Sequence, residues 1–576
     1  MCGIAGVLDL GGRPVDRAVL QRMSDVIEHR GPDDAGIHVD GNLGFAHRRL
    51  SIIDLSADAH QPMLSEDGRT CVIFNGEIYN YLELADELRR QGCVFRSRSD
   101  TEVILHAYRT WGPACVHRFN GMFAIALWDR DQRSLWLVRD RLGVKPLYYA
   151  LDGGRLVFGS EIKALREAGA GRRANPMAMA QYLERSFPVD DSTWFEGVHA
   201  LLPGNMAHVD RQGLRIEQYW DPAPIYRRAE HRENAAEEIR GLFEDSVRLR
   251  LRSDVPVGAF LSGGLDSSSV VALMSQLCEA PVHTFSGSFP DGPVYDEREF
   301  IQVVTERFRS DHHEVVPSPD LAPELLPRLI WHMDEPSAGP GLVPQYVVCR
   351  LAAEQGVKVV NGGQGGDELF GGYPKYLHHR SAAARAGAEL RRLRRRVLGR
   401  THPAFPRGDV PALPRVSDDP LTNEMYVDVR RYLAALLHVD DRTSMAVSIE
   451  SRTPLLDYRL VELAASIPAA DKMAGGVLKS LLRDAMRDLL PPVIVDRRDK
   501  RGFPTPIGLW MRGPLYGWTR SVLLDADFLA RRVYTRRHLD LLLTAHHRGV
   551  VDATHALWQA LSIALWFQQF DAQTAW

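Results

Sequence analysis

Apolar residues in the first two hundred positions gather in short runs of strand length that are separated by turns. Runs of this kind occupy residues 2–10, 43–54, 70–80, 121–129, 134–140, 146–151 and 155–160. Helical candidates are fewer, at 19–28, 81–92 and 100–112. In the second of these, the apolar side chains are Leu82, Leu84, Ala85 and Leu88, and the charged residues are left to face water. Many closely spaced strands with few helices predict a layered α+β domain with helices packed outside its sheets.

The pattern changes in the second half of the chain, where apolar strands alternate with helices. A strand from Val255 to Leu261 leads into a helix that Asp266 opens, and further strand–helix units follow at 281–289 and 356–373. This alternation predicts an α/β domain with a doubly wound parallel sheet, which binds its ligand at the carboxyl ends of the strands.

The boundary between the two patterns is expected at residues 216–235. The stretch DPAPIYRRAEHREN (221–234) has the proline and charge content of a linker, and a charged helix begins near Asn234. A chain of 576 residues is also too long for one hydrophobic core. We therefore expect a first domain at 1–215 and a second domain at 236–576.

Composition narrows the class of protein. Apolar residues make up 45% of the chain and charged residues 25%, as in ordinary soluble globular proteins. The formal net charge of -4 gives no general attraction to nucleic acid or membrane, no run of about 18 apolar residues occurs, and no secretory signal is found. The six cysteines lack CxxC pairs and companion histidines, so a disulfide framework and a zinc site are poorly supported. We expect a reduced, cytoplasmic protein with no membrane or nucleic-acid partner.

The first candidate chemistry lies at the start of the chain, where Cys2 follows Met1 directly. If Met1 is removed, Cys2 carries a thiol nucleophile and, as its α-amine, a neighbouring base. The alternative is a chance cysteine at a frayed terminus. Asn75 and Gly76, at the end of an apolar strand, can aim a side-chain amide and a backbone N–H at one oxyanion, or they can form an ordinary hairpin turn.

Two further residues of the first half offer charges. Arg49, just before a predicted strand, can grip a carboxylate with two hydrogen bonds, although a lone arginine is usually solvated. Asp100 is predicted at a helix N-cap, which is sufficient to explain it on its own.

The order of these elements is more informative than each one alone. MCGIAG, HRGPDD (29–34), HRRLSIID (47–54), FNGEIYN (74–80), SDTE (99–102) and RDRLGVKPLYY (139–149) together resemble the class II glutamine amidotransferase domain, an amino-terminal hydrolase. The resemblance implies that Cys2 attacks the side-chain amide of glutamine to give a thioester and ammonia. It also implies an oxyanion hole at Asn75 and Gly76. Glutamine would be held by Arg49 at its carboxylate and by Glu77 and Asp100 at its α-amine.

The second half contains the string VPVGAFLSGGLDSSSVVALM, in which a strand meets a helix at a glycine- and serine-rich loop. Such a loop lets the backbone and a helix N-terminus approach a polyanion. It contains no lysine and matches no Walker A motif. The alternative is a generic Gly-Ser turn. The string resembles the pyrophosphate loop of the ATP pyrophosphatase superfamily, in which ATP is cleaved between its α and β phosphates.

The resemblance extends to HTFSGSF, which is similar to the strand lining the adenine, and to GGQGGDELFGGY, which is similar to a second loop at the ATP and acceptor site. The implied ATP-binding residues are Leu261, Ser262, Gly263, Gly264, Asp266, Ser267, Ser268, Phe285, Gly362 and Gly363. Asp266 and Asp367 would bind magnesium, although Asp367 can also be a helix cap. Lys479 would stabilise charge on the transferring phosphates, or it is an exposed helix lysine.

Together the two halves resemble glutamine-hydrolysing asparagine synthetases across essentially the whole chain. The implied reaction uses ATP and magnesium to adenylate a carboxylate, with aspartate the first candidate, and glutamine-derived ammonia then attacks the acyl-adenylate. AMP and pyrophosphate are released, ammonia travels internally, and RDRLGVKPLYY is expected at the domain interface. A homodimer is left open.

One loop departs from the family on the acceptor side. Gln364 stands where the family carries glutamate, and MDEPSAGPGLVPQY is richer in glycine than an aspartate pocket would suggest. Glutamine can hydrogen-bond but cannot act as a base. The acceptor can therefore also be another carboxylate, either a uronic acid sugar or a natural-product acid.

A basic and proline-rich insertion is predicted at about 378–420, with arginines concentrated between Arg380 and Arg400. A solvated helix and loose insertion explain it. The other explanation is an anionic partner, as in transfer-RNA-modifying pyrophosphatases, but their additional cysteines or zinc motifs are missing here. A non-catalytic binding protein is hard to reconcile with the presence of Cys2, Asn75, Asp266 and Asp367.

Overall fold

The computed structural model describes residues 2–337, 339–380, 387, 390, 393, 397–405, 410–499 and 505–574. Most of the arginine-rich part of the predicted insertion lies outside these residues, as does Met1.

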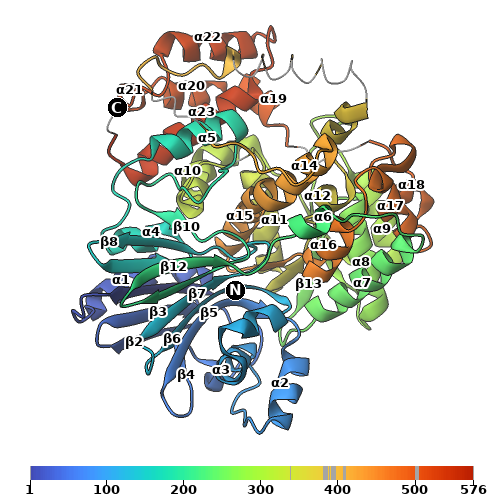
Figure 1. The fold of residues 1–576 in the computed structure, drawn as a ribbon. Coiled ribbons are helices and arrows are strands. Elements are labelled where there is room, and N and C mark those ends of the chain that lie inside the picture. The colour runs from blue at the N-terminus through green and yellow to red at the C-terminus, as the bar shows by residue number, and fades with distance from the viewer. Residues whose placement is uncertain are drawn as a thin grey trace.

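The first domain is built on two six-stranded antiparallel sheets (Figure 1). In spatial order, the first sheet consists of β10 (His199–Ala200), β8 (Tyr148–Asp152), β9 (Arg155–Gly159), β1 (Gly3–Asp9), β3 (Leu43–Arg49) and β2 (Asp34–Asp40). The second consists of β12 (Gly213–Gln218), β11 (Asn205–Asp210), β7 (Ser134–Arg139), β6 (Gly121–Asp129), β5 (Thr70–Ile78) and β4 (Met63–Leu64).

Alternation along the strands places one set of side chains between the two sheets. Ile4 of β1 and Ile73 of β5 belong to the apolar cluster between them, whereas Val7 and Phe74 face the helices outside. Every residue of β1 is buried, because the strand is covered on both faces. The predicted layered α+β domain is confirmed.

The second domain contains a five-stranded sheet whose strands are all parallel. Its order is β15 (Asp311–Val315), β14 (His283–Gly287), β13 (Val257–Phe260), β16 (Val359–Asn361) and β17 (Glu450–Arg452). In chain order, β14 and β15 are added on one side of β13, and β16 and β17 are then added on its other side. This change of direction confirms the doubly wound sheet. The loops after these two strands flank the switch point, where such folds bind ligands.

Helices cover both faces of this parallel sheet, and other helices pack against the two sheets of the first domain. In the first domain, the helices are α1 (Arg17–Asp25), α2 (Tyr81–Arg90), α3 (Asp100–Trp111), α4 (Ile162–Glu167) and α5 (Pro176–Arg185). In the second half they are α6 (Ala223–Tyr226), α7 (Ala235–Arg250), α8 (Leu265–Leu277), α9 (Arg298–Phe308), α10 (Ala322–Met333), α11 (Leu342–Glu354), α12 (Gly366–Phe370), α14 (Pro420–Val427), α15 (Leu433–Met445), α16 (Tyr458–Ala465), α17 (Ser480–Met486) and α18 (Pro492–Val495). The chain ends in α19 (Ile507–Arg512), α20 (Tyr516–Leu523), α21 (Ala526–Ala530), α22 (Arg536–His547) and α23 (Thr554–Phe570).

The carboxyl-terminal helices pack back onto the first domain, above the sheets in Figure 1. The indole of Trp566 in α23 lies 5.1 Å from the rings of Trp194 and Phe195, measured between centroids. The indole nitrogen of Trp566 also donates to the carbonyl of Asp334, at 2.7 Å. One apolar cluster therefore runs from α1 and α4 into α10 and α23, and the two halves of the chain share a core.

Three local expectations were wrong. The strand predicted at 43–54 ends at Arg49, so this residue closes a strand instead of preceding one. Helix α3 is capped by Ser99, whose side chain accepts from the backbone of Thr101, and Asp100 is the first helical residue. Leu82 is 45% exposed, while Leu84, Ala85 and Leu88 form the buried face of α2.

No helix among the described residues is long and apolar enough to cross a bilayer.

Two candidate active sites and the contacts between them

Cys2 lies buried directly before β1 and faces Asn75 of the second sheet. Its backbone nitrogen donates to Oδ1 of Asn75 at 3.2 Å, and its Sγ lies 4.0 Å from the carbonyl oxygen of Leu50. Burial raises the pKa of the Cys2 thiol, so the thiol needs a base to become a nucleophile. This nitrogen would be the α-amine of a chain from which Met1 had been removed.

Asn75 and Gly76 lie inside β5 and do not form a turn. Asn75 is on the face of β5 that carries Ile73, and this face is directed at the first sheet and at Cys2. Its Nδ2 donates to Oγ of Ser160 at 3.4 Å. Gly76 has φ +154°, and a Cβ at this position would lie 2.0 Å from the carbonyl oxygen of Met122. Only glycine fits here, because any side chain would clash with the backbone of β6.

Arg49 is buried and is held by the loop that follows its strand. Its two terminal nitrogens donate to the carbonyl oxygens of Ser56, at 3.0 Å, and Asp54. Each terminal nitrogen of a guanidinium has two N–H groups, so donors remain for a ligand carboxylate.

Glu77, which lies close enough to Cys2 to influence its thiol, forms a buried acidic pair with Asp100. Burial raises the pKa of Glu77 well above its usual value, and the negative charges of Glu450 and Asp100 raise it further. Burial also raises the pKa of Asp100 to about 7, although its Oδ2 accepts a hydrogen bond from the backbone of Ile78 at 2.9 Å. A cationic amine placed between these carboxyl groups would offset the unfavourable burial of their charges.

The second site is a cavity of about 460 Å³ at the carboxyl ends of β13 and β16, within the size range of small-molecule sites. The predicted residues that line it are Leu261, Ser262, Gly264, Asp266, Ser267, Phe285, Gly362, Gly363, Gln364, Asp367 and Lys479. Gly263 and Ser268 are not among the lining residues. Ser268 is fully buried in α8, and Gly263 has its carbonyl oxygen 3.2 Å from a guanidinium nitrogen of Arg497.

Hydrogen bonds between Ser262 and Ser267 join the two ends of the glycine-rich loop. Oγ of Ser267 accepts from the backbone of Ser262 at 3.1 Å and lies 3.0 Å from its hydroxyl. Gly263 has φ +69°, and a Cβ there would approach Cβ of Phe300 to 2.6 Å. The positive φ of this glycine lets the loop bend sharply between β13 and α8, and the close packing leaves no room for a side chain.

Lys479 is 5% exposed and lies at the N-cap of α17, so it is not an exposed helix lysine. Its Nζ lies 2.5 Å from Oδ2 of Asp266 and 2.6 Å from Oδ1 of Asp367. Burial alone would lower the pKa of Lys479, but the two carboxylates outweigh it and raise that pKa. The structure thus joins three residues from three separate segments into one charged group facing the cavity.

Sequence reasoning assigned no role to Arg30, which connects the two domains. Its Nε donates to the carbonyl oxygen of Cys2 at 3.1 Å. Its terminal nitrogens bind both carboxylate oxygens of Asp441 in α15, at 2.9 and 3.1 Å, and Nη1 also binds Glu161 at 2.9 Å. All of these side chains are buried. The segment that carries Cys2 is therefore hydrogen-bonded, through Arg30, to a helix of the second domain.

Other contacts extend this interface. Lys145, in RDRLGVKPLYY, has its Nζ 3.8 Å from Asp441, so the motif lies at the interface as expected. Glu77 has Oε1 3.7 Å from a guanidinium nitrogen of Arg452 in β17. The carbonyl oxygen of Arg452 in turn accepts from the backbone of Gly362 at 2.8 Å. A short chain of contacts thus leads from the glutamine side of the molecule to the loop that lines the cavity.

The motifs HRGPDD and SIESRTP contain Arg30 and Arg452, and both were visible in the sequence. Their partners were not, because 411 positions separate Arg30 from Asp441.

Comparison with known proteins assigns a family to each half of the chain. Residues 1–220 match the glutamine amidotransferase domain family, and residues 238–568 match the asparagine synthase family. With the fold and the two sites, these matches define a glutamine-hydrolysing carbon–nitrogen ligase.

The similarity to individual relatives spans nearly the full chain. Asparagine synthetase [glutamine-hydrolyzing] 1 of Bacillus subtilis is 30% identical, over 98% of this chain and 96% of the relative. A putative asparagine synthetase of Mycobacterium tuberculosis is 33% identical, over 99% and 97%. Amidase chry2 of Gibberella zeae is 27% identical, over 92% of each chain. The chain belongs to the family of glutamine-hydrolysing asparagine synthetases.

Proposed function

We propose that this protein converts L-aspartate to L-asparagine, using ATP and ammonia released from glutamine, with AMP and pyrophosphate as the other products. The observation that carries the proposal is the meeting of Asp266, Asp367 and Lys479 at the cavity of the parallel sheet, in a chain whose buried Cys2 lies in the other domain. Family membership over nearly the full length supports the same reaction.

In the first domain, removal of Met1 leaves an α-amine that takes the proton of the Cys2 thiol. The thiolate attacks the amide carbon of glutamine, while the side-chain amide of Asn75 and the N–H of Gly76 donate to the oxyanion. Arg49 binds the carboxylate of glutamine, and Glu77 with Asp100 receives its α-amine. The intermediate then collapses as its C–N bond breaks, and the protonated α-amine of Cys2 gives its proton to the leaving nitrogen, so that ammonia departs and a thioester remains. Water hydrolyses the thioester to glutamate and restores the Cys2 thiol.

In the second domain, the loop from Ser262 to Ser267 binds the phosphates through backbone N–H groups and hydroxyls. Asp266 and Asp367 suit magnesium, because both carboxylates face one cavity and hard divalent cations prefer oxygen ligands. Bound magnesium would supply positive charge that neutralises the phosphate oxygens. Lys479 adds a fixed positive charge between the two carboxylates, close to where charge develops on the phosphates.

Ammonia must reach the activated carboxylate without being protonated in solvent. The contacts of Arg30 and Arg452 hold the two sites in a fixed relation, which supports internal transfer. In this division of work, residues 1–215 hydrolyse glutamine and residues 236–576 form the amide.

The acceptor itself is decided by groups such as Gln364, which lines the cavity. Its neutral amide can orient the incoming nitrogen but cannot remove a proton from it. A uronic acid sugar or a natural-product acid is therefore the second candidate acceptor.

A pyrophosphate-release screen of the purified enzyme, with ATP, magnesium and ammonia, tests the proposal. Aspartate, hexuronates and other small carboxylic acids are offered in turn, and products are identified by mass. We expect aspartate-dependent release coupled to asparagine, and Gln364→Glu should keep or raise that rate, because a general base contributes roughly 10²–10⁴-fold. No release with aspartate, together with robust release on another acid, would reject aspartate while keeping the ligase.

A further inference from the structure

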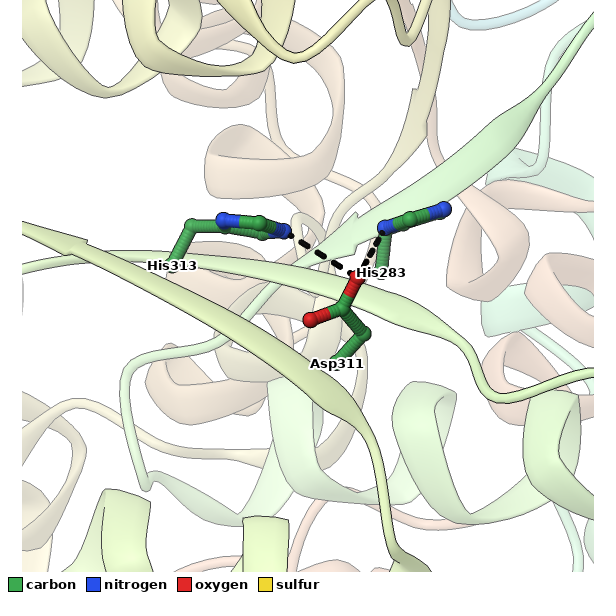
Figure 2. A group of neighbouring side chains, drawn as sticks. All are labelled: His283, Asp311 and His313. Carbon is green, nitrogen blue, oxygen red and sulfur yellow. Dashed lines mark ion pairs between the residues drawn. The ribbon is translucent and has the colours of Figure 1, made fainter.

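Two histidines and an aspartate converge at the outer edge of the parallel sheet, and none of the three lines the cavity of the second domain. Strands β14 and β15 are parallel neighbours in which His283 pairs with Asp311, and Phe285 pairs with His313. Side chains alternate along a strand, so Asp311 and His313 share one face, and His283 and Phe285 share the same face next to it. Figure 2 shows the two imidazoles on either side of the Asp311 carboxylate.

The distances within this cluster fit a metal ion. Oδ2 of Asp311 lies 2.9 Å from Nδ1 of His283 and 3.4 Å from Nε2 of His313. The three candidate ligand atoms all lie within 4.8 Å of one another. Zinc–nitrogen and zinc–oxygen bonds are about 2.1 Å long, which separates neighbouring ligand atoms by about 3.0–3.4 Å. Little movement is needed for all three atoms to bind one ion.

The two ring nitrogens also lack hydrogen bonds among the described residues. Nδ1 of His283 and Nε2 of His313 are each shielded from solvent and have no hydrogen-bond partner of good geometry, although a carboxylate oxygen is close to both. Buried polar atoms are normally satisfied, and a cation is a partner that both imidazole lone pairs and the carboxylate can share.

The chemistry of the ligand set selects the ion. Two imidazoles and one carboxylate suit borderline divalent metals such as Zn²⁺ or Co²⁺ more than Mg²⁺ or Ca²⁺, which prefer oxygen alone. The side chains of His283 and Asp311 are 40% and 51% exposed, so water can complete the coordination.

We propose that His283, Asp311 and His313 form a zinc site that fastens the edge strand β15 to β14. The ion would not touch the reacting phosphates, because His283 and Asp311 begin their strands, whereas the ATP cavity lies at the carboxyl ends. The site supports the cavity wall instead. The ring of His313 stacks on Phe285, with centroids 5.3 Å apart and planes 18° apart, and Phe285 lines the cavity.

The test measures metal binding directly. Enzyme freed of metal by a chelator is titrated with Zn²⁺ under equilibrium dialysis, and with Co²⁺ followed by its visible absorption. We expect one more bound equivalent in the wild type than in His283→Ala or His313→Ala. Affinity at this site should fall by at least about tenfold in each single variant and in Asp311→Asn, since even outer-shell changes cost 10–100-fold.

The matched control is His231→Ala, because Nδ1 of His231 also lies 2.9 Å from an aspartate, Asp471, but this pair is not part of a three-ligand cluster in the described chain. It should bind metal as the wild type does. Zn²⁺ should raise the melting temperature of the wild type and of the control, but not of the His313→Ala variant.

Denaturant unfolding and ammonia-dependent pyrophosphate release of each variant check that the mutated domain is folded. Equal zinc stoichiometry in the wild type and in folded His283→Ala and His313→Ala would overturn the proposal. So would a cobalt spectrum that these substitutions leave unchanged. The result does not depend on which acid is the acceptor.

Discussion

Replacing Lys479 with methionine removes one buried positive charge and keeps most of the side-chain volume. In the wild type, Nζ is 2.5 Å from Asp266 and 2.6 Å from Asp367. The two carboxylate oxygens can therefore be no more than about 5 Å apart, and at an effective dielectric constant of about 20 their repulsion is about 3 kcal/mol. Breaking a buried ion pair typically costs 3–5 kcal/mol, which agrees with this figure.

Two measurable consequences follow for Lys479→Met. The free energy of unfolding should fall by about 3 kcal/mol without magnesium, and millimolar magnesium should restore part of it, because a cation then replaces the ammonium between the carboxylates. Acceptor-dependent pyrophosphate release should fall by about 10²–10³-fold, as expected when one fixed donor to the developing charge is lost. Glutamine hydrolysis should survive, since Cys2 lies in the other domain.

The assay pairs denaturant unfolding with pyrophosphate release, and Lys358→Met is the control. Lys358 forms a 2.9 Å ion pair with Asp33, but its side chain is 38% exposed. An exposed pair of this kind contributes about 0–1 kcal/mol. The reasoning would be refuted if Lys479→Met released pyrophosphate within tenfold of the wild type, or if the control lost as much stability.

Three further substitutions test the first domain. Cys2→Ala should abolish glutamine-dependent synthesis while ammonia-dependent synthesis persists; loss of both in folded protein would contradict separate sites. Burial raises the pKa of Asp100 to about 7, so its carboxyl gains charge as pH rises from about 6 to 8 and the KM for glutamine should fall over that range. A KM profile for Asp100→Asn as steep as that of the wild type would count against this assignment. Arg30→Met leaves Asp441 without its bidentate partner and should destabilise the protein by about 3–5 kcal/mol in denaturant unfolding; an unchanged unfolding midpoint would show that the contact is weak.

Much of the architecture could be predicted because it depends on short-range pattern. A strand followed by Ser262-Gly263-Gly264 and an apolar helix specifies a phosphate-type loop locally, and the alternation of strands and helices specifies a parallel sheet. The strand that contains Asn75 was equally clear from its apolar residues. These signals need no knowledge of where the rest of the chain lies.

Other features were decided only by tertiary structure. The side-chain direction of Leu82 is set by which face of α2 meets the sheet, and apolar character alone does not reveal this. The burial of Lys479 depends on Asp266 and Asp367, which come from two other segments.

The same holds for contacts across the molecule. Arg30 meets Asp441 over 411 positions, and His283 meets Asp311 only because β15 pairs with β14 in one register. The sequence by itself determined which elements form and which loops bear chemistry, since both follow from neighbouring residues. Packing determined which charged side chains meet, because such contacts require that distant segments be brought together and water be excluded from between them.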